Sequence, residues 1–182
     1  MKNYWTLYKP FLKFIGTFLL AFILLTFLYH WYLSGYEKNQ IDGITRLVAS
    51  HVEKVLQVFD SNSAVVYDNK TKISILMHQK EVARIIEGCN AISVVILFVS
   101  FVMAFAGRVS TTLFFLLGGS VLMYVLNVIR IAVLSVLLYR FPAYEDLLHG
   151  VIFPLFIYGV VFILWFIWVN YFSSYAKKST SK

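Results

Sequence analysis

Long apolar stretches separated by shorter polar ones dominate this chain. Four of them reach or approach the roughly 20 residues with which a helix crosses the hydrocarbon core of a bilayer. They cover residues 11–33, 89–106, 112–138 and 149–171, and the second is near the lower length limit. The pattern therefore predicts an all-α membrane protein in which residues 1–182 form a single membrane domain with four transmembrane helices.

The segment between the first two apolar stretches, residues 34–88, has a different pattern. Residues 41–59 place apolar side chains at three- and four-residue steps, which predicts an amphipathic helix lying along the outer leaflet or over the mouths of the other helices. The runs 64–67, 72–76 and 82–86 are short, rich in β-favouring residues and separated by turn residues. We expect a small extracytoplasmic cap made of this helix and a β-hairpin or meander, with an irregular loop as the alternative.

The composition agrees with the membrane class. The 182 residues are 60% hydrophobic and 14% charged, which excludes an ordinary soluble domain of this size. The single cysteine excludes a disulfide within the chain.

The charges predict an orientation. With four helices, both chain ends and the short connection after the second helix share one side. Seven of the 16 Lys and Arg residues lie there without any acid, and the other nine balance the nine acids on the opposite side. The positive-inside rule then makes both termini cytoplasmic, with residues 172–182 as a cytoplasmic tail. Short basic clusters of this kind contact membrane lipid, so a nucleic-acid partner is rejected.

Three polar side chains are expected at one depth near the outer face. Cys89 begins the second predicted helix, and Arg130 lies inside the third. At about 1.5 Å per residue both are roughly 26 Å above the connection between these helices. His149, at the outer start of the fourth helix, falls within a turn or so of that level. Separately, these residues are explained as a packed thiol, a snorkelling arginine and an interfacial cap.

Together the three side chains have the chemistry of acyl transfer. A thiol becomes nucleophilic as the thiolate, which a neighbouring cation favours. An imidazole can take the thiol proton and return it to a leaving amine, while a guanidinium can stabilise an oxyanion. Glu87 is close enough in sequence to orient His149 or to pair with Arg130, and Asn127 either bonds within the site or satisfies a neighbouring helix. No cofactor or metal is predicted, because the four histidines lack ligand spacing.

Three short motifs at these positions resemble a known family. Glu87-Gly88-Cys89-Asn90 is similar to the E-x-C-S/N box of the exosortases and archaeosortases, and residues 127–131 are similar to their N-x-x-R-I segment. His149-Gly150 matches their third catalytic position. The length, with four predicted helices, resembles the short exosortase F type, whereas longer members have about eight.

The resemblance implies a membrane-embedded cysteine protease or transpeptidase in the bacterial cytoplasmic (inner) membrane. Such enzymes process exported proteins that carry a C-terminal sorting signal, which consists of a short motif, a transmembrane helix and a basic tail. Cys89 would be the nucleophile of a thioester mechanism, His149 the general acid and base, and Arg130 the oxyanion stabiliser. The supporting positions would be Glu87, Asn90 and Asn127. Whether water or an amine accepts the acyl group stays open.

A different class of function fits the same topology. The chain would then be a non-enzymatic assembly factor or scaffold of an envelope export system, and the amphipathic face of residues 41–59 would bind its partner. A small transporter is disfavoured, because no charged path reaches the inner face.

Overall fold

The structure is a computed structural model that describes residues 4–36, 40–68, 72–86, 88–105 and 107–173. In chain order its elements are α1 (Tyr4–Ser34), α2 (Gly43–Phe59), β1 (Ser63–Asp68), β2 (Lys72–Met77), β3 (Lys80–Ile85), α3 (Ile92–Ala104), α4 (Val109–Arg140), η1 (Pro142–Tyr144), α5 (Glu145–Leu147), η2 (Leu148–Ile152), α6 (Phe153–Ile167) and η3 (Trp168–Phe172).

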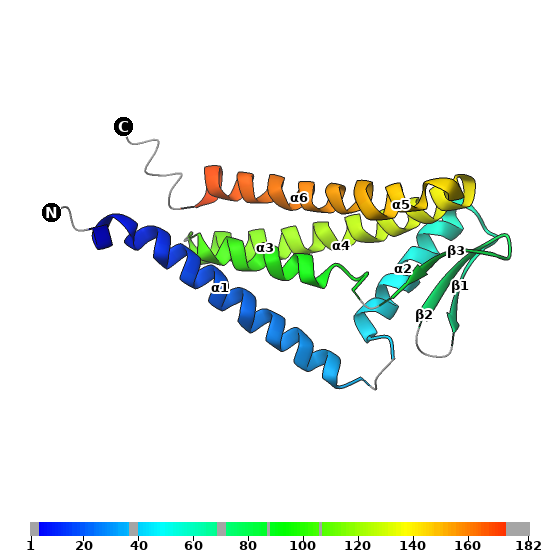
Figure 1. The fold of residues 1–182 in the computed structure, drawn as a ribbon, viewed down its shortest axis with the longest axis horizontal. Coiled ribbons are helices and arrows are strands. Elements are labelled where there is room, and N and C mark those ends of the chain that lie inside the picture. The colour runs from blue at the N-terminus through cyan, green and yellow to red at the C-terminus, as the bar shows by residue number, and fades with distance from the viewer. Residues whose placement is uncertain (1–3, 37–39, 69–71, 87, 106, 174–182) are drawn as a thin grey trace.

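The long helices form a bundle that carries the cap at one end. Figure 1 shows α3, α4 and α6 running side by side, while α1 packs on α3 and diverges from the bundle toward the cap. Phe14 of α1 contacts Phe101 and Phe105 at ring-centroid distances of 5.9 Å and 4.6 Å. The sheet and α2 lie at the end of the bundle opposite the start of α1 (Figure 1).

Within the described residues, three helical segments are long and apolar enough to cross a membrane, namely Tyr8–Ser34, Val109–Arg140 and Pro142–Phe172. The fourth predicted span, residues 89–106, contains a helix of 13 residues, because residues 88–90 form a turn before α3 begins. At 1.5 Å per residue α3 is about 20 Å long, shorter than the roughly 30 Å hydrocarbon core. A mostly helical chain with helices that could span a membrane is thus confirmed, and the count of four spans stays a prediction.

The helix predicted over residues 149–171 begins earlier than expected. A 3₁₀ turn with Pro142 at its first position opens the run, and α5 continues it into the π-helical turn η2. Proline suits this position because the missing N–H would be unpaired there in any case. His149 therefore lies inside the helical run and not at its start, which corrects the sequence prediction.

The connection between α3 and α4 packs against the end of α6. The indole Nε1 of Trp168 donates a hydrogen bond of 3.3 Å to the Phe105 carbonyl, and Gly107 pairs with Ser173 as an isolated bridge. A Cβ on Gly107 would lie 2.9 Å from the Trp168 ring, so glycine permits this close approach. The end of the bundle remote from the cap is held together by these contacts.

The predicted amphipathic helix is α2, and it lies over the bundle. Asp42 caps it, because its carboxylate accepts hydrogen bonds from the backbone N–H groups of Ile44 and Thr45. Its apolar face is buried against the sheet and α4 in one cluster, which includes Val48, Ala49, Val52, Leu56, Ile73, Ile75, Ile85, Val128, Ile131 and Ala132. The helix thus packs on the side of α4 near the cap end, and neither predicted position, along the outer leaflet or over the helix mouths, is decided by these contacts.

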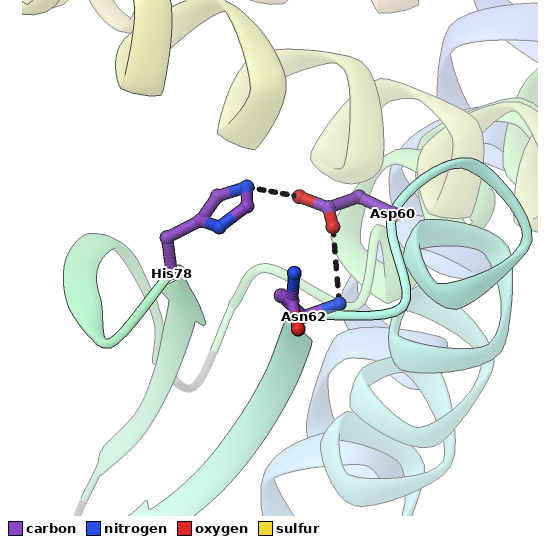
Figure 2. A network of polar contacts seen from close by, with 3 residues as sticks. All are labelled: Asp60, Asn62 and His78. Atoms are coloured by element: carbon purple, nitrogen blue, oxygen red, sulfur yellow. Dashed lines mark hydrogen bonds and ion pairs between the residues drawn. The ribbon is translucent and has the colours of Figure 1, made fainter.

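The predicted meander is a three-stranded antiparallel sheet in the order β1-β2-β3. His78 and Gln79 form the two-residue turn between β2 and β3 with φ of 50° and 64°, as type I′ hairpins require. The His78 imidazole lies 3.0 Å from the Asp60 carboxylate, which also accepts the Asn62 N–H (Figure 2). The same ring stacks on Tyr139 of α4. The hairpin tip is therefore held against both α2 and α4.

Candidate active site

A tight turn presents Cys89 ahead of α3. The Cys89 N–H donates a hydrogen bond of 3.0 Å to the Ile86 carbonyl. Gly88 adopts a φ of +96°, and Ala91 adopts 61°, a left-handed conformation that is costly for a residue with a Cβ. The chain thus reverses sharply around the half-buried cysteine.

Asn127 fixes this turn to α4. Its side chain is fully buried, and its amide nitrogen donates a hydrogen bond of 2.8 Å to the Cys89 carbonyl. Asn127 lies about one helical turn before Arg130 on α4. This hydrogen bond therefore holds the Cys89 segment next to the Arg130 guanidinium. Two roles were predicted for Asn127, a hydrogen bond within the site or one to a neighbouring helix. The structure has the bond to the Cys89 carbonyl, which lies at the site.

Asn90 holds the opposite side of the turn. Its amide nitrogen donates hydrogen bonds to the hydroxyls of Tyr29 and Thr45, at 2.8 Å and 3.1 Å, and its oxygen accepts the Ile92 N–H at the start of α3. The Thr45 hydroxyl in turn donates to Asp42. This buried cluster joins α1, α2 and α3, so Asn90 supports the turn from behind.

Cys89, Arg130 and His149 line one cleft of about 570 Å³. They come from three separate parts of the chain: the turn before α3, the middle of α4, and η2. The described residues that line it are Glu81, Val82, Ala83, Arg84, Ile85, Ile86, Cys89, Arg130, Ile131, Leu134, Leu138, Glu145 and His149. The structure therefore brings together the three residues that the sequence analysis selected.

Arg130 carries an unmatched donor in this cleft. Its Nε atom is buried and has no hydrogen-bond partner among the described residues. The guanidinium is close enough to Cys89 and to Tyr158 of α6 for electrostatic interaction. A buried donor without a partner costs free energy, so an oxygen atom brought by a ligand would gain a favourable position here.

Two acidic residues that the sequence analysis did not select line the cleft. Glu87 lies outside the described residues, so its predicted role is not placed. Glu145 lines the cleft four residues before His149, and Glu81 lines it from β3. The sequence analysis missed both. The signal for Glu145 was its i, i+4 spacing from His149, which puts the two on one helix face.

An ion pair lies in the cleft wall formed by β3. Arg84 is hydrogen-bonded to Glu81, and this bond holds the pKa of the Glu81 carboxyl below its ordinary value. Glu145 adds a favourable electrostatic interaction with Arg84. The cleft wall therefore presents both signs of charge to an incoming group.

The site has the components of an acyl-transfer centre in an open arrangement. No hydrogen bond joins the thiol, guanidinium and imidazole in the part of the chain that the structure describes. Catalytic hydrogen bonds in substrate-free enzymes are often long and tighten when substrate binds. Within the same described part, no group of three His, Cys, Asp or Glu side chains is placed to hold a metal ion.

Comparison with known proteins gives no match to a family model, a curated protein or a solved structure.

Proposed function

We propose that this chain is a membrane-embedded cysteine protease or transpeptidase that acts by thioester acyl transfer, as its resemblance to short exosortases implies. The observation that carries the proposal is the cleft in which Cys89, Arg130 and His149 converge from distant parts of the sequence. Two features add support. Arg130 has a buried donor without a partner among the described residues, and His149 lies on a π-helical turn, a structure that often marks functional sites.

The proposed reaction has two steps. The Cys89 sulfur attacks the scissile carbonyl carbon as its proton passes to His149, and Arg130 stabilises the oxyanion. The C–N bond then breaks, and His149 gives its proton to the leaving amine, which leaves a thioester on Cys89. Water or an acceptor amine attacks the thioester, loses a proton to His149, and the thiol is restored when that proton returns to sulfur.

The proposed topology has four passes with the cleft on the outer face of a bacterial cytoplasmic membrane. The start of α1 and the end of α6 lie at one end of the bundle and the cap lies at the other, as four passes require (Figure 1). Lys9, Lys13 and Arg108 lie toward the former end, whereas the described acidic residues all lie at the cap end. The positive-inside rule then makes the cap extracytoplasmic and both termini cytoplasmic.

The proposed substrate is the C-terminal sorting signal of an exported protein. The cleft has a volume of about 570 Å³, which lies within the usual 300–1,000 Å³ range of ligand sites. A cleft at the cap end of the bundle suits a cleavage site just outside the membrane, next to the transmembrane helix of such a signal. Membrane lipid would surround the remaining apolar surface.

The proposal is tested by Cys89→Ala in cells that express an epitope-tagged exported protein ending in a short motif, an apolar helix and a basic tail. We expect full-length substrate to accumulate in the membrane while the variant inserts at the wild-type level. His149→Ala should give the same block. The exposed Ser110→Ala, at the opposite end of α4, is the control and should process normally. Normal processing by Cys89→Ala would refute the nucleophile.

The scaffold alternative keeps only part of its predicted docking surface. It assigned partner binding to the apolar face of residues 41–59, but most of that face is buried against the sheet and α4, and Leu47 and Phe59 are the large apolar side chains of the face that stay exposed. Substituting Val48 or Val52 should therefore unfold the cap instead of releasing a partner.

A further inference from the structure

The two outer edges of the sheet have different surroundings. Strand β1 has its edge toward α2, where the Val65 N–H donates a hydrogen bond of 2.9 Å to the Glu53 carboxylate. The Gln57 amide nitrogen lies 3.4 Å from the Ser63 carbonyl on the same strand. Side chains of α2 thus supply partners for this edge, which is one way in which proteins protect exposed strands.

Strand β3 forms the other edge and borders the cleft. Among the described residues, no backbone hydrogen bond joins its outer edge to another segment. In an antiparallel sheet every second residue of an edge strand directs its N–H and C=O away from the neighbouring strand, and β3 follows this alternation except at the extra residue Val82, between Glu81 and Ala83. These groups on β3 are therefore available to a further strand.

The free edge leads directly to the nucleophile. Six consecutive residues, Glu81 to Ile86, line the same cleft as Cys89. The Ile86 carbonyl accepts the Cys89 N–H, so the strand runs straight into the turn that carries the thiol. On the inner side, Ala83 packs against Leu134 and Leu138 of α4, which keeps β3 fixed in the cleft wall.

We propose that β3 is a docking strand for an extended peptide, which adds to its free edge and thereby brings one of its carbonyl groups to Cys89. This inference rests on the proposed function for the role of the thiol. At about 3.3 Å per residue, the wall from Glu81 to Ile86 can pair with about five or six peptide residues. Main-chain hydrogen bonds supply the affinity in this mode of recognition, and contacts with alternate side chains supply selectivity.

The test uses alkylation of Cys89, which needs no acyl transfer. The probe is a pentapeptide of alternating valine and threonine with an N-terminal iodoacetyl group; the sulfur displaces iodide and forms a thioether. The full chain in detergent micelles is treated with this peptide or with iodoacetamide, and labelling is followed by mass spectrometry. We expect the peptide to react about tenfold faster at equal concentration, because a few additional hydrogen bonds hold it beside the thiol.

Backbone methylation gives the decisive comparison. Two further peptides carry N-methyl groups on alternate amides, in the odd or the even register. An added strand uses every second amide, so one register should lose the acceleration and the other should keep it. Equal rates for the two registers, or no acceleration by the unmethylated peptide, would overturn the docking strand.

A photocrosslinker on the protein provides a matched control. Benzoylphenylalanine replaces Arg84 on β3 or Val66 on β1, both of which are exposed strand positions. The unreactive acetyl form of the same peptide should crosslink from the Arg84 position and not from the Val66 position. The reverse preference, or equal crosslinking, counts against the proposal. Register-dependent docking together with normal processing by Cys89→Ala would instead refute the proposed function and leave the docking strand intact.

Discussion

The turn that carries Cys89 has two sides with opposite polar chemistry. Behind it, Asn90, Tyr29 and Thr45 form a buried cluster in which the Asn90 amide donates two hydrogen bonds and accepts one. In front of it, the cleft holds Cys89, Arg130 and His149 without hydrogen bonds among them in the described structure. The buried Arg130 Nε atom has no hydrogen-bond partner within the described ranges of the chain.

This difference separates groups that hold the fold from groups that await a ligand. A buried polar group that is matched contributes modestly to stability, whereas an unmatched one costs free energy. A buried polar group without a hydrogen-bond partner is expected where a substrate supplies that partner. Asn127 lies between the two sides: its amide nitrogen bonds to the Cys89 carbonyl, while its buried oxygen has no partner among the described residues.

The largest effect is expected from a substitution in the cleft in front of the turn. Arg130→Gln removes the proposed oxyanion stabiliser and should lower substrate processing by about 10²–10³-fold. The thermal midpoint should stay the same or rise, because no ion pair joins Arg130 to another of the described residues. Arg140→Gln, an exposed arginine at the end of the same helix, is the matched control and should process normally. A large fall in thermal midpoint for Arg130→Gln would show a structural role.

A substitution in the hydrogen-bonded cluster behind the turn should instead lower the stability of the fold. Asn90→Ala removes the hydrogen bonds that its amide donates to the Tyr29 and Thr45 hydroxyls and the one that it accepts from the Ile92 N–H, which should lower the free energy of unfolding by about 3 kcal/mol. Thermal unfolding in detergent measures this change. Asn170→Ala, which removes an exposed side-chain bond to the Phe166 carbonyl, should be nearly neutral. Equal stability of the two variants would contradict the distinction between the two sides.

A smaller effect is expected where the helices below the turn pack. A Cβ on Gly119 would lie 2.4 Å from the Phe98 ring, whereas one on Gly118 meets nothing within 4 Å. Gly119→Ala should therefore lower the unfolding free energy by about 1–2 kcal/mol, because the buried Phe98 ring must shift. Gly118→Ala, the adjacent control, should be neutral or slightly stabilising. Thermal midpoints of the pair that coincide would contradict the close α3–α4 contact.

Much of the fold followed from periodicity, because period and length are physical properties of single elements. The three- and four-residue steps of residues 41–59 predicted α2, and the short β-favouring runs predicted the sheet. The predicted helix over 112–138 is α4, which extends a few residues further at both ends. The second span was overestimated, because apolar composition continues through the turn at Cys89 where the backbone is no longer helical.

The candidate site could be predicted in part for a similar reason. Depth along a helix is nearly linear in residue number, so Cys89 and Arg130 could be placed at one level from sequence. Which side chains face each other depends on helix rotation and on the path of the cap. Glu145, Glu81 and the wall of β3 were therefore missed, and Asn90 proved to be a buried structural residue.

The smallest expected effect concerns Glu81, an exposed cleft residue whose hydrogen bond is already made. The bond to Arg84 lowers the pKa of the Glu81 carboxyl in the folded chain. The ionised carboxylate therefore stabilises the fold at pH values above its ordinary pKa of about 4.3. This stabilisation is lost as the pH falls through the lowered pKa. Thermal midpoints of wild type and Glu81→Gln should differ slightly at neutral pH and converge below about pH 4. Solvent screens the exposed pair, which keeps the difference small. A difference that widened on acidification would mean that the folded state raises the pKa of Glu81, and the ion pair in the wall of the cleft would have to be abandoned.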